Sequence, residues 1–174
     1  MKKVTLVVAF LATFGIVKAQ SDYKQAIGAR VSPTHQEYEL FAGSYKFFVT
    51  EPGAIELNLG FGGKKYPVPG ESNEKNAPGI SFSGTYQHHF DIKPVDGLRW
   101  FIGGGGVLFN IASKHDRYKG FGAGVYPTGG VDYKFRGIPL NVTADVRPTF
   151  YVTSPDNYGS FHGQAVGLAA RYTF

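Results

Sequence analysis

The chain has 174 residues, with 18 lysines and arginines against 13 aspartates and glutamates and a formal net charge of +5. It contains no cysteine, which excludes a disulfide framework, a thiolate metal site and a lipidated cysteine. Glycine (24), phenylalanine (15) and tyrosine (11) are abundant, and this composition favours a single all-β domain.

The first nineteen residues are typical of an export signal. Lys2 and Lys3 precede a mostly apolar run over residues 4–17, and Ala19 closes a segment of the kind a signal peptidase reads. The run is shorter than the about 20 residues that a membrane-crossing helix needs. We predict a signal peptide over 1–19 and one domain over 20–174. Without Lys2, Lys3 and Lys18 the basic side chains fall to 15 against 13 acidic ones, and a net charge of +2 argues against a nucleic-acid partner.

Eight segments of the remaining chain alternate between apolar and polar residues with a period of two, the pattern of a strand with two different faces. In the second segment, for example, Phe41, Tyr45 and Phe47 share one face while Ser44 and Lys46 share the other. The eight predicted strands cover residues 24–32, 39–50, 54–63, 79–92, 98–111, 121–135, 140–151 and 164–174.

The connections between these segments alternate in length. Short, turn-like connections fall at 51–53, 93–97 and 136–139, whereas 64–78, 113–120 and 153–163 are longer and polar, with 32–37 intermediate. Short turns at one end and longer loops at the other are typical of outer-membrane barrels, whose strands need about 9–11 residues to cross a membrane.

The two faces predict which side of the sheet meets lipid. The polar face carries charges of both signs, while the apolar face carries aromatic residues toward the short-turn end, as an interfacial girdle would. In 98–111 both faces are partly apolar, and we place Trp100 outward because tryptophan favours a membrane interface. The expected fold is an all-β, eight-stranded, antiparallel, up-and-down transmembrane β-barrel.

The chain resembles the small eight-stranded outer-membrane barrels of Gram-negative bacteria, the group of OmpX-like proteins and the OmpA membrane domain. The matching features are the export signal, the eight alternating segments and the closing residues 169–174. The resemblance implies a monomer in the cell outer membrane, in contact with membrane lipid and lipopolysaccharide. It also implies that Tyr172 and Phe174 belong to a signal read by the barrel-assembly machinery.

Polar residues on the inward face form a candidate lumenal charge network. Eight strands enclose a space about wide enough for side chains to fill, so we expect compensating charges in preference to an open ion path. Turn symmetry places Phe48 opposite Glu56, and Asp145 opposite Arg171. The predicted network consists of Lys46, Glu56, Asp132, Lys134, Asp145, Arg147 and Arg171.

Histidines give no convincing metal site. His88 and His89 are adjacent in a strand, so they point to opposite faces and one metal cannot easily bind both. His35, His115 and His162 fall in predicted loops, where convergence on a metal is possible but where histidine is also common. We expect no metal and no cofactor.

The best catalytic candidate is a loop group. Ser160 and His162 are two residues apart, with Asp156 nearby, as a nucleophile, a base and an orienting acid would require. No rigid element is predicted to hold this group, so an ordinary polar loop is the favoured interpretation.

Two sequence features predict local backbone behaviour. The run Gly103–Gly106 permits tight curvature and a close approach of neighbouring groups within a strand. Pro148 cannot donate to the strand ladder, so we expect a bulge or a frayed rim there.

The sequence therefore predicts a barrel without catalytic activity, with a structural or surface-interaction role and four extracellular loops. The alternatives are a lipid-modifying enzyme acting on lipid A or phospholipid, a narrow pore, and a soluble secreted barrel that carries a hydrophobic ligand.

Overall fold

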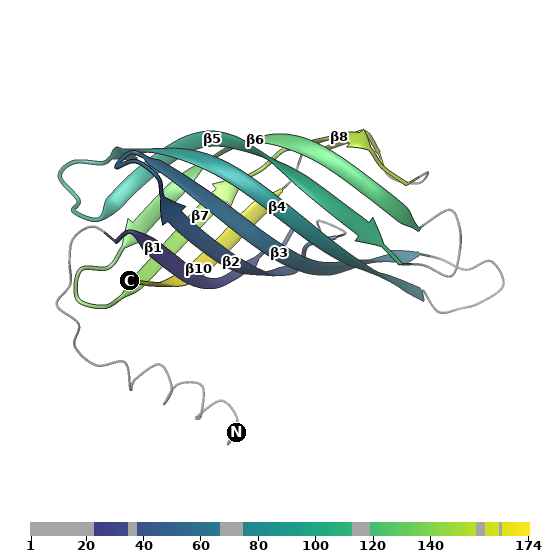
Figure 1. Cartoon of the computed structure of the whole chain (residues 1–174), viewed down its shortest axis with the longest axis horizontal. Helices are drawn as coiled ribbons and strands as arrows, with labels where there is room; N and C mark the ends of the chain where they lie inside the picture. Colours follow the sequence, from purple (N-terminus) through teal and green to yellow (C-terminus); the bar gives the residue numbers. More distant parts are fainter. Residues whose placement is uncertain (1–22, 35–37, 67–74, 113–118, 156–158, 164) are drawn as a thin grey trace, which may run out of the picture.

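A computed structural model of the chain describes residues 23–34, 38–66, 75–112, 119–155, 159–163 and 165–174 (Figure 1). No helix in these ranges is long and apolar enough to cross a membrane. The strands are β1 (Gln25–Val31), β2 (Phe41–Phe48), β3 (Gly53–Tyr66), β4 (Lys75–Asp91), β5 (Leu98–Ile111), β6 (Gly120–Lys134), β7 (Leu140–Val146), β8 (Thr149–Thr153), β9 (Phe161–His162) and β10 (Val166–Thr173).

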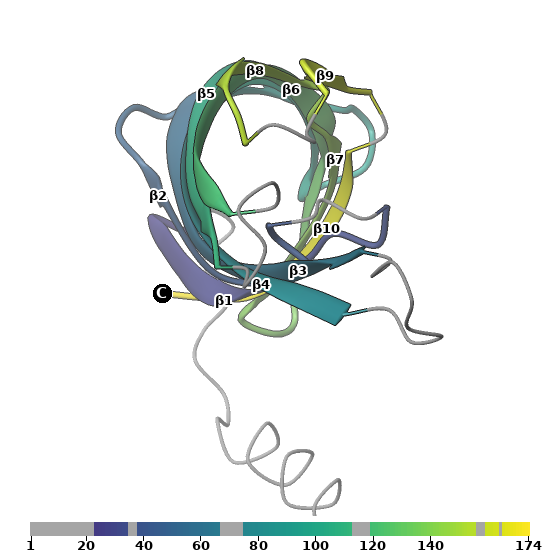
Figure 2. The same ribbon diagram turned by 90° about the vertical axis from the view of Figure 1, so that its right-hand side faces the viewer.

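Eight of these strands close into an antiparallel barrel, which Figure 2 shows as a ring in end view. Strands β1 to β7 pair in chain order, β10 follows β7, and β10 pairs with β1 to close the ring. The short strands β8 and β9 lie outside this ring order, with β8 on β6 and β9 on β8. Every predicted segment contains a strand, so the prediction of an eight-stranded antiparallel barrel is confirmed.

The barrel has two different ends. At the short-turn end, tight connections join β2 to β3, β4 to β5 and β6 to β7, and β1 begins beside the end of β10 (Figure 1). At the long-loop end, β3 and β4 extend further than predicted, to Tyr66 and from Lys75, so part of the expected loop over 64–78 is strand.

The break between β7 and β8 falls at Pro148, as predicted. Before it, Val146 pairs with Gly129 of β6, and after it, Phe150 pairs with Val125 in the same register. The two strands are therefore one line of chain interrupted where proline has no N–H to donate. On the other side of the strand, the Arg147 N–H continues the ladder toward β10 by donating to the Ala165 carbonyl at 2.7 Å.

The two predicted cross-strand registers are wrong. Lys46, not Phe48, lies opposite Glu56, because the β2–β3 turn is centred on Glu51, where Gly53 N–H donates to the Thr50 carbonyl at 3.1 Å.

In the last hairpin Asp145 lies opposite Gly167, and Arg171 lies opposite Asn141. The observed register differs from the predicted one by four residues. Strands β8 and β9 continue the hairpin, with Thr149 opposite His162, and this pairing centres the hairpin nearer to residue 156 than to residue 158.

The inside of the barrel is polar and the outside is apolar. Inward positions carry Ser44, Asn58, Thr85 and Asn141, each at most 2 % exposed, while the exposed large hydrophobic residues point outward. In β5, Trp100 is 44 % exposed and the adjacent Phe101 only 1 %. The outward placement of Trp100 is confirmed.

The glycine run in β5 yields a prediction about stability. A Cβ on Gly103 would lie 1.9 Å from the Tyr86 carbonyl oxygen of β4, whereas a Cβ on Gly106 would make an ordinary contact of 3.5 Å with the Gly124 carbonyl oxygen. Overpacking against backbone costs about 1–3 kcal/mol. We therefore expect Gly103→Ala to lower the free energy of unfolding in urea by that amount, in detergent micelles.

The matched control is Gly106→Ala, three residues along the same strand, which should change the free energy of unfolding by less than about 0.5 kcal/mol. Equal effects of the two substitutions would show that close approach of β4 to β5 at Gly103 does not limit the side chain there.

Candidate functional site

The lumen holds a charge-balanced network that is the candidate functional site. Among the described residues, eight charged side chains are at most 3 % exposed, four cationic and four anionic. We call them the lumen network: Arg30, Lys46, Arg147 and Arg171 with Glu39, Glu56, Asp132 and Asp145. Buried charges are tolerated only when paired and hydrogen-bonded, so the equal numbers are what burial requires.

Glu56 of β3 is the centre of the network. One carboxylate oxygen accepts from Arg147 Nη2 at 2.8 Å, and the other lies 2.9 Å from Arg171 Nη2. The amides of Asn58 and Gln87 donate to the same carboxylate at 3.0 and 2.7 Å. Glu56 thus joins β3 to β4, to β10 and to Arg147 beside β7.

A second carboxylate links the centre to the long-loop end. Asp145 accepts two hydrogen bonds from Arg30, at 2.5 and 2.9 Å, and one from Arg147 Nε at 3.0 Å. Arg30 Nε also donates to Glu39 at 3.2 Å. The line from Glu39 through Arg30, Asp145 and Arg147 to Glu56 therefore alternates in sign.

A third group lies toward the short-turn end. Lys46 Nζ donates to Asp132 at 2.6 Å and is 3.0 Å from His89 Nε2. Asn141 and Thr143 donate to the same Asp132 carboxylate at 2.8 and 2.9 Å. Asp132 consequently holds β2, β6 and β7 together from inside.

The structure brings six of the seven predicted network residues together. The seventh, Lys134, is near the short-turn rim and donates to the Phe135 and Ile138 carbonyls at 2.6 and 2.9 Å. The sequence prediction omitted Arg30 and Glu39. Arg30 could have been found, because it lies on the polar face of its strand, whereas Glu39 precedes β2 and reaches the lumen through the β1–β2 connection.

The lumen narrows from the short-turn end inward. A cavity of about 270 Å³ lies at that mouth, lined by residues 91–99 together with Tyr23, Asp132, Lys134 and Arg136. Toward the other end, a cavity of only about 10 Å³ lies among Tyr38, Glu39, Tyr126 and Arg147. This volume is no larger than the space that a single water molecule needs. Fully buried members of the lumen network lie between the two.

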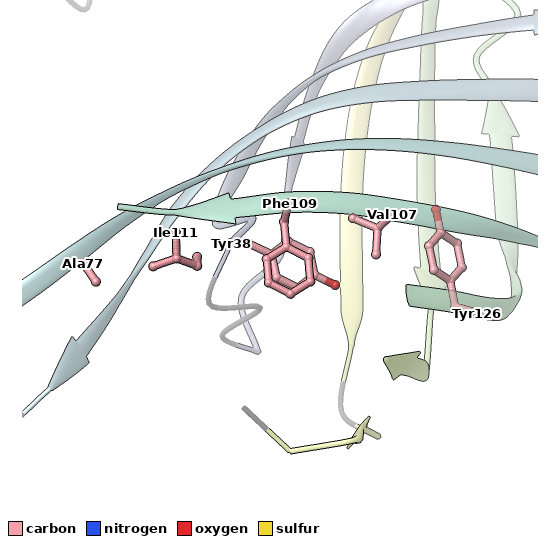
Figure 3. Packing of buried hydrophobic residues seen from close by; sticks show 6 residues of the cluster. All are labelled: Tyr38, Ala77, Val107, Phe109, Ile111 and Tyr126. Carbon is pink, nitrogen blue, oxygen red and sulfur yellow. The ribbon is translucent and has the colours of Figure 1, made fainter. Parts of the chain in front are cut away.

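Aromatic side chains close the long-loop end of the lumen. Figure 3 shows Tyr38 stacked on Phe109, with ring centroids 4.4 Å apart. They belong to a buried cluster of Tyr38, Ala77, Val107, Phe109, Ile111 and Tyr126. The chain therefore seals this mouth with apolar packing and the centre with ion pairs.

The metal and catalytic candidates are placed as follows. His88 is on the outer face and His89 is buried inside, so the two point apart as predicted. Ser160 is exposed, and His162 is half-buried in β9. Asp156, His35 and His115 lie outside the described residues. Within the described ranges no group of three or more potential metal ligands is found.

No protein-family model, curated protein or solved structure matches the chain. The class of protein that the fold and the lumen define is a closed, eight-stranded antiparallel β-barrel with a polar interior.

The position of Glu56 yields a prediction about stability. Glu56→Gln preserves the shape of the side chain but leaves Arg171 without its carboxylate, and breaking a buried ion pair costs about 3–5 kcal/mol. We expect that loss in the free energy of unfolding in urea. Asp91→Asn is the control, because the Asp91–Arg99 pair is partly exposed and such pairs contribute about 0–1 kcal/mol.

A second substitution separates charge from packing. Adding Arg171→Met to Glu56→Gln removes the unpaired cation and should recover part of the loss. If Glu56→Gln and Asp91→Asn cost the same, the centre of the network does not stabilise the barrel.

The buried Tyr38 yields a prediction about alkaline pH. Burial raises the pKa of Tyr38 above its ordinary value. The ionised form is then favoured in the unfolded chain, so the stabilisation from Tyr38 is complete below pH about 10 and is lost as the pH rises further.

We therefore expect the free energy of unfolding of the parental chain to fall more steeply above pH about 10 than that of Tyr38→Phe, which cannot ionise. Tyr45→Phe removes an exposed hydroxyl that donates to Gln25 and serves as the control, with the parental slope. Identical slopes for the parental chain and Tyr38→Phe would contradict the burial of the phenol.

Proposed function

We propose that this protein is a non-enzymatic outer-membrane β-barrel with a structural or surface-interaction role, which presents four loops to the outside of the cell. The observation that carries this proposal is the inverted distribution of polarity. In the part of the chain that the structure describes, nine charged side chains are buried inside, the eight of the lumen network and Lys134, while leucines, phenylalanines and valines are about half exposed outside. A barrel in water buries its apolar side chains, whereas a barrel in lipid exposes them.

Aromatic residues at both ends support a membrane position. Near the short-turn end the outward face carries Tyr45, Tyr86, Phe90, Trp100, Tyr133, Tyr172 and Phe174. Near the long-loop end it carries Phe41, Phe61, Phe121, Phe150 and Phe161, each at least 50 % exposed. The sequence prediction recognised only the first girdle. Aromatic residues gathered toward both ends of the outward face are the arrangement expected at the two interfaces of a bilayer.

The ladder is long enough to cross a bilayer. Strands β3, β4, β5 and β6 have 14, 17, 14 and 15 residues, more than the about 9–11 that a tilted strand needs. The shorter β1 and β2 are extended by hydrogen bonds from Ser32 N–H to Leu40 and from Phe48 N–H to Lys24. Pairing of β1 with β10 closes the sheet and leaves no unpaired edge strand in the ring. A sheet in lipid must be closed in this way, because lipid offers no partner for free backbone N–H and C=O groups.

The lumen favours a scaffold over a narrow pore. Side chains of Lys46, Glu56, Asn58 and Arg171 fill the cross-section, each at most 1 % exposed. The polar filling also argues against carriage of a hydrophobic ligand inside a soluble barrel. The lipid-modifying enzyme remains an alternative that rests on Ser160 and His162, and an unchanged lipid A mass spectrum after deletion of the gene would exclude lipid A as its substrate.

The proposed partners are membrane lipid, lipopolysaccharide and the barrel-assembly machinery. Tyr172 and Phe174 lie on the outward face of the closing strand, with ring centroids 6.4 Å apart. Gln25 and Phe174 exchange backbone hydrogen bonds of 3.1 and 2.9 Å, which tie this segment to β1. Their role as an assembly signal stays a prediction.

A pair of lysine substitutions tests the membrane position. Phe82 is 51 % exposed near the middle of β4, and Val95 is 47 % exposed in the short β4–β5 turn. A lysine at the bilayer midplane costs about 2–4 kcal/mol, falling to about 0–1 near an interface. We expect Phe82→Lys to reduce stability in lipid vesicles by the larger amount and Val95→Lys by less than about 1 kcal/mol.

In water the two exposed positions would be equivalent, and each lysine would change stability by less than about 0.5 kcal/mol. Equal, small effects, together with recovery of the protein from soluble fractions without detergent, would overturn the proposal of an outer-membrane barrel.

A further inference from the structure

The aromatic cluster at the long-loop end contains one residue that does not come from a strand. Tyr38 belongs to the β1–β2 connection and enters the barrel mouth, where it is 1 % exposed (Figure 3). Its ring stacks on Phe109 with an interplanar angle of 14° and meets Tyr151 edge-on at 6.3 Å. Phe109 belongs to β5 of the ring, and Tyr151 belongs to β8, which pairs with β6, so the surfaces that hold the ring come from the sheet.

The polar end of the ring is also satisfied by the wall. The Tyr38 hydroxyl hydrogen-bonds with the hydroxyls of Thr149 and Tyr151. Thr149 is fixed in turn, because its hydroxyl donates to the Arg147 carbonyl at 2.9 Å. The wall therefore offers a stacking surface, an aromatic edge and two hydroxyl partners in one place, which together match a phenol.

Glycines make room for the connection that carries Tyr38 and for the Phe109 ring. A Cβ on Gly62 would lie 2.6 Å from the Tyr38 carbonyl carbon, and one on Gly60 would lie 2.7 Å from Glu39 Cγ. On β6, directly opposite Phe109 of β5, a Cβ on Gly122 would lie 2.1 Å from the Phe109 ring. Gly62 and Gly60 thus let residues 38 and 39 approach β3, and Gly122 makes room for the Phe109 ring on which Tyr38 stacks. We call the space that the Tyr38 ring fills the slot.

We propose that this slot is a binding site for a small planar phenol and that Tyr38 is its internal occupant. What holds the Tyr38 ring is stacking on Phe109, the edge contact with Tyr151 and the hydroxyl bonds. A free phenol of the same shape can make each of these contacts. Ligand and Tyr38 then compete for one place, and binding of the ligand requires the Tyr38 ring to leave.

The connection sets the strength of this competition. Tyr38 is held close to the slot by the Glu39–Arg30 ion pair of 3.2 Å and by Leu40 N–H, which donates to the Phe61 carbonyl at 2.8 Å. A short tether gives an internal group an effective concentration in the millimolar range or above. The parental chain should therefore bind a free phenol weakly, and loss of the Tyr38 ring should expose the full affinity.

The experiment uses p-cresol, the side chain of tyrosine as a free molecule, titrated calorimetrically into purified, folded full-length protein in detergent micelles. We expect Tyr38→Ala to bind p-cresol at least tenfold more tightly than the parental chain. Tyr45→Ala, which removes a half-buried tyrosine of the outer face, is the matched control for partition of p-cresol into micelles and should behave as the parental chain.

Two further measurements identify the site. Toluene lacks the hydroxyl, so Tyr38→Ala should bind it more weakly than p-cresol, and Thr149→Val added to Tyr38→Ala should reduce that difference. Phe109→Leu added to Tyr38→Ala should lower the affinity for p-cresol at least tenfold, because the stacking surface is lost.

Equal binding by Tyr38→Ala, Tyr45→Ala and the parental chain would overturn the proposal, as would tight binding that survives Phe109→Leu. Should Tyr38→Ala fail to fold, Tyr38→Val retains an apolar side chain and leaves most of the slot empty, and the same expectations apply to it. The experiment is independent of the proposed membrane position, because a slot that binds p-cresol can exist in a barrel of any location.

Discussion

The structure depends on one constraint, the neutralisation of charge inside a narrow closed barrel. Eight strands leave a lumen that side chains must fill, and the chain fills its centre with four cations and four anions. None of these charges could be buried alone, because an unpaired ion in a medium of low dielectric costs several kcal/mol. Each carboxylate of the network therefore contacts at least one cation from another strand or connection.

This constraint accounts for the joining of elements that are distant in the sequence. Glu56 in β3 meets Arg147 after β7 and Arg171 in β10, while Asp132 in β6 meets Lys46 in β2. The backbone ladder joins only neighbours around the ring, whereas these ion pairs cross it. Ion-paired side chains therefore fill the lumen and link its walls, while the outward face carries apolar residues. That division is the reason why we propose a membrane-embedded scaffold and not a channel or a carrier.

The sequence predicted the faces of the strands but not their registers, and the reason is physical. A period of two assigns each side chain to a face, so Trp100 and Phe101 could be placed on opposite sides. A register error of two or four residues leaves every side chain on its own face. The pattern alone therefore could not reveal that Lys46, and not Phe48, lies opposite Glu56, because turn geometry decides that.

The remaining misses are the two lumen residues of the β1–β2 connection and the aromatic residues of the long-loop end. Tyr38 and Glu39 precede β2, which begins at Phe41, yet both enter the lumen. The predicted strand over 39–50 included Glu39, and its period of two placed that side chain on the outward face with Phe41. Gly60 and Gly62 of β3 make room for them, because a Cβ at either position would clash with residue 38 or 39. The girdle of phenylalanines at the long-loop end was missed because its members are spread singly over five strands.

The central claim, a lumen closed by its own charges, is tested most directly by single-channel recording. Purified protein would be inserted into a planar lipid bilayer, and the current would be followed under an applied voltage. The ion pairs of Glu56 and Asp132 and the packing of Tyr38 on Phe109 predict insertion without unitary conductance steps. A steady, reproducible unitary conductance from the parental protein would contradict the account and favour the narrow pore.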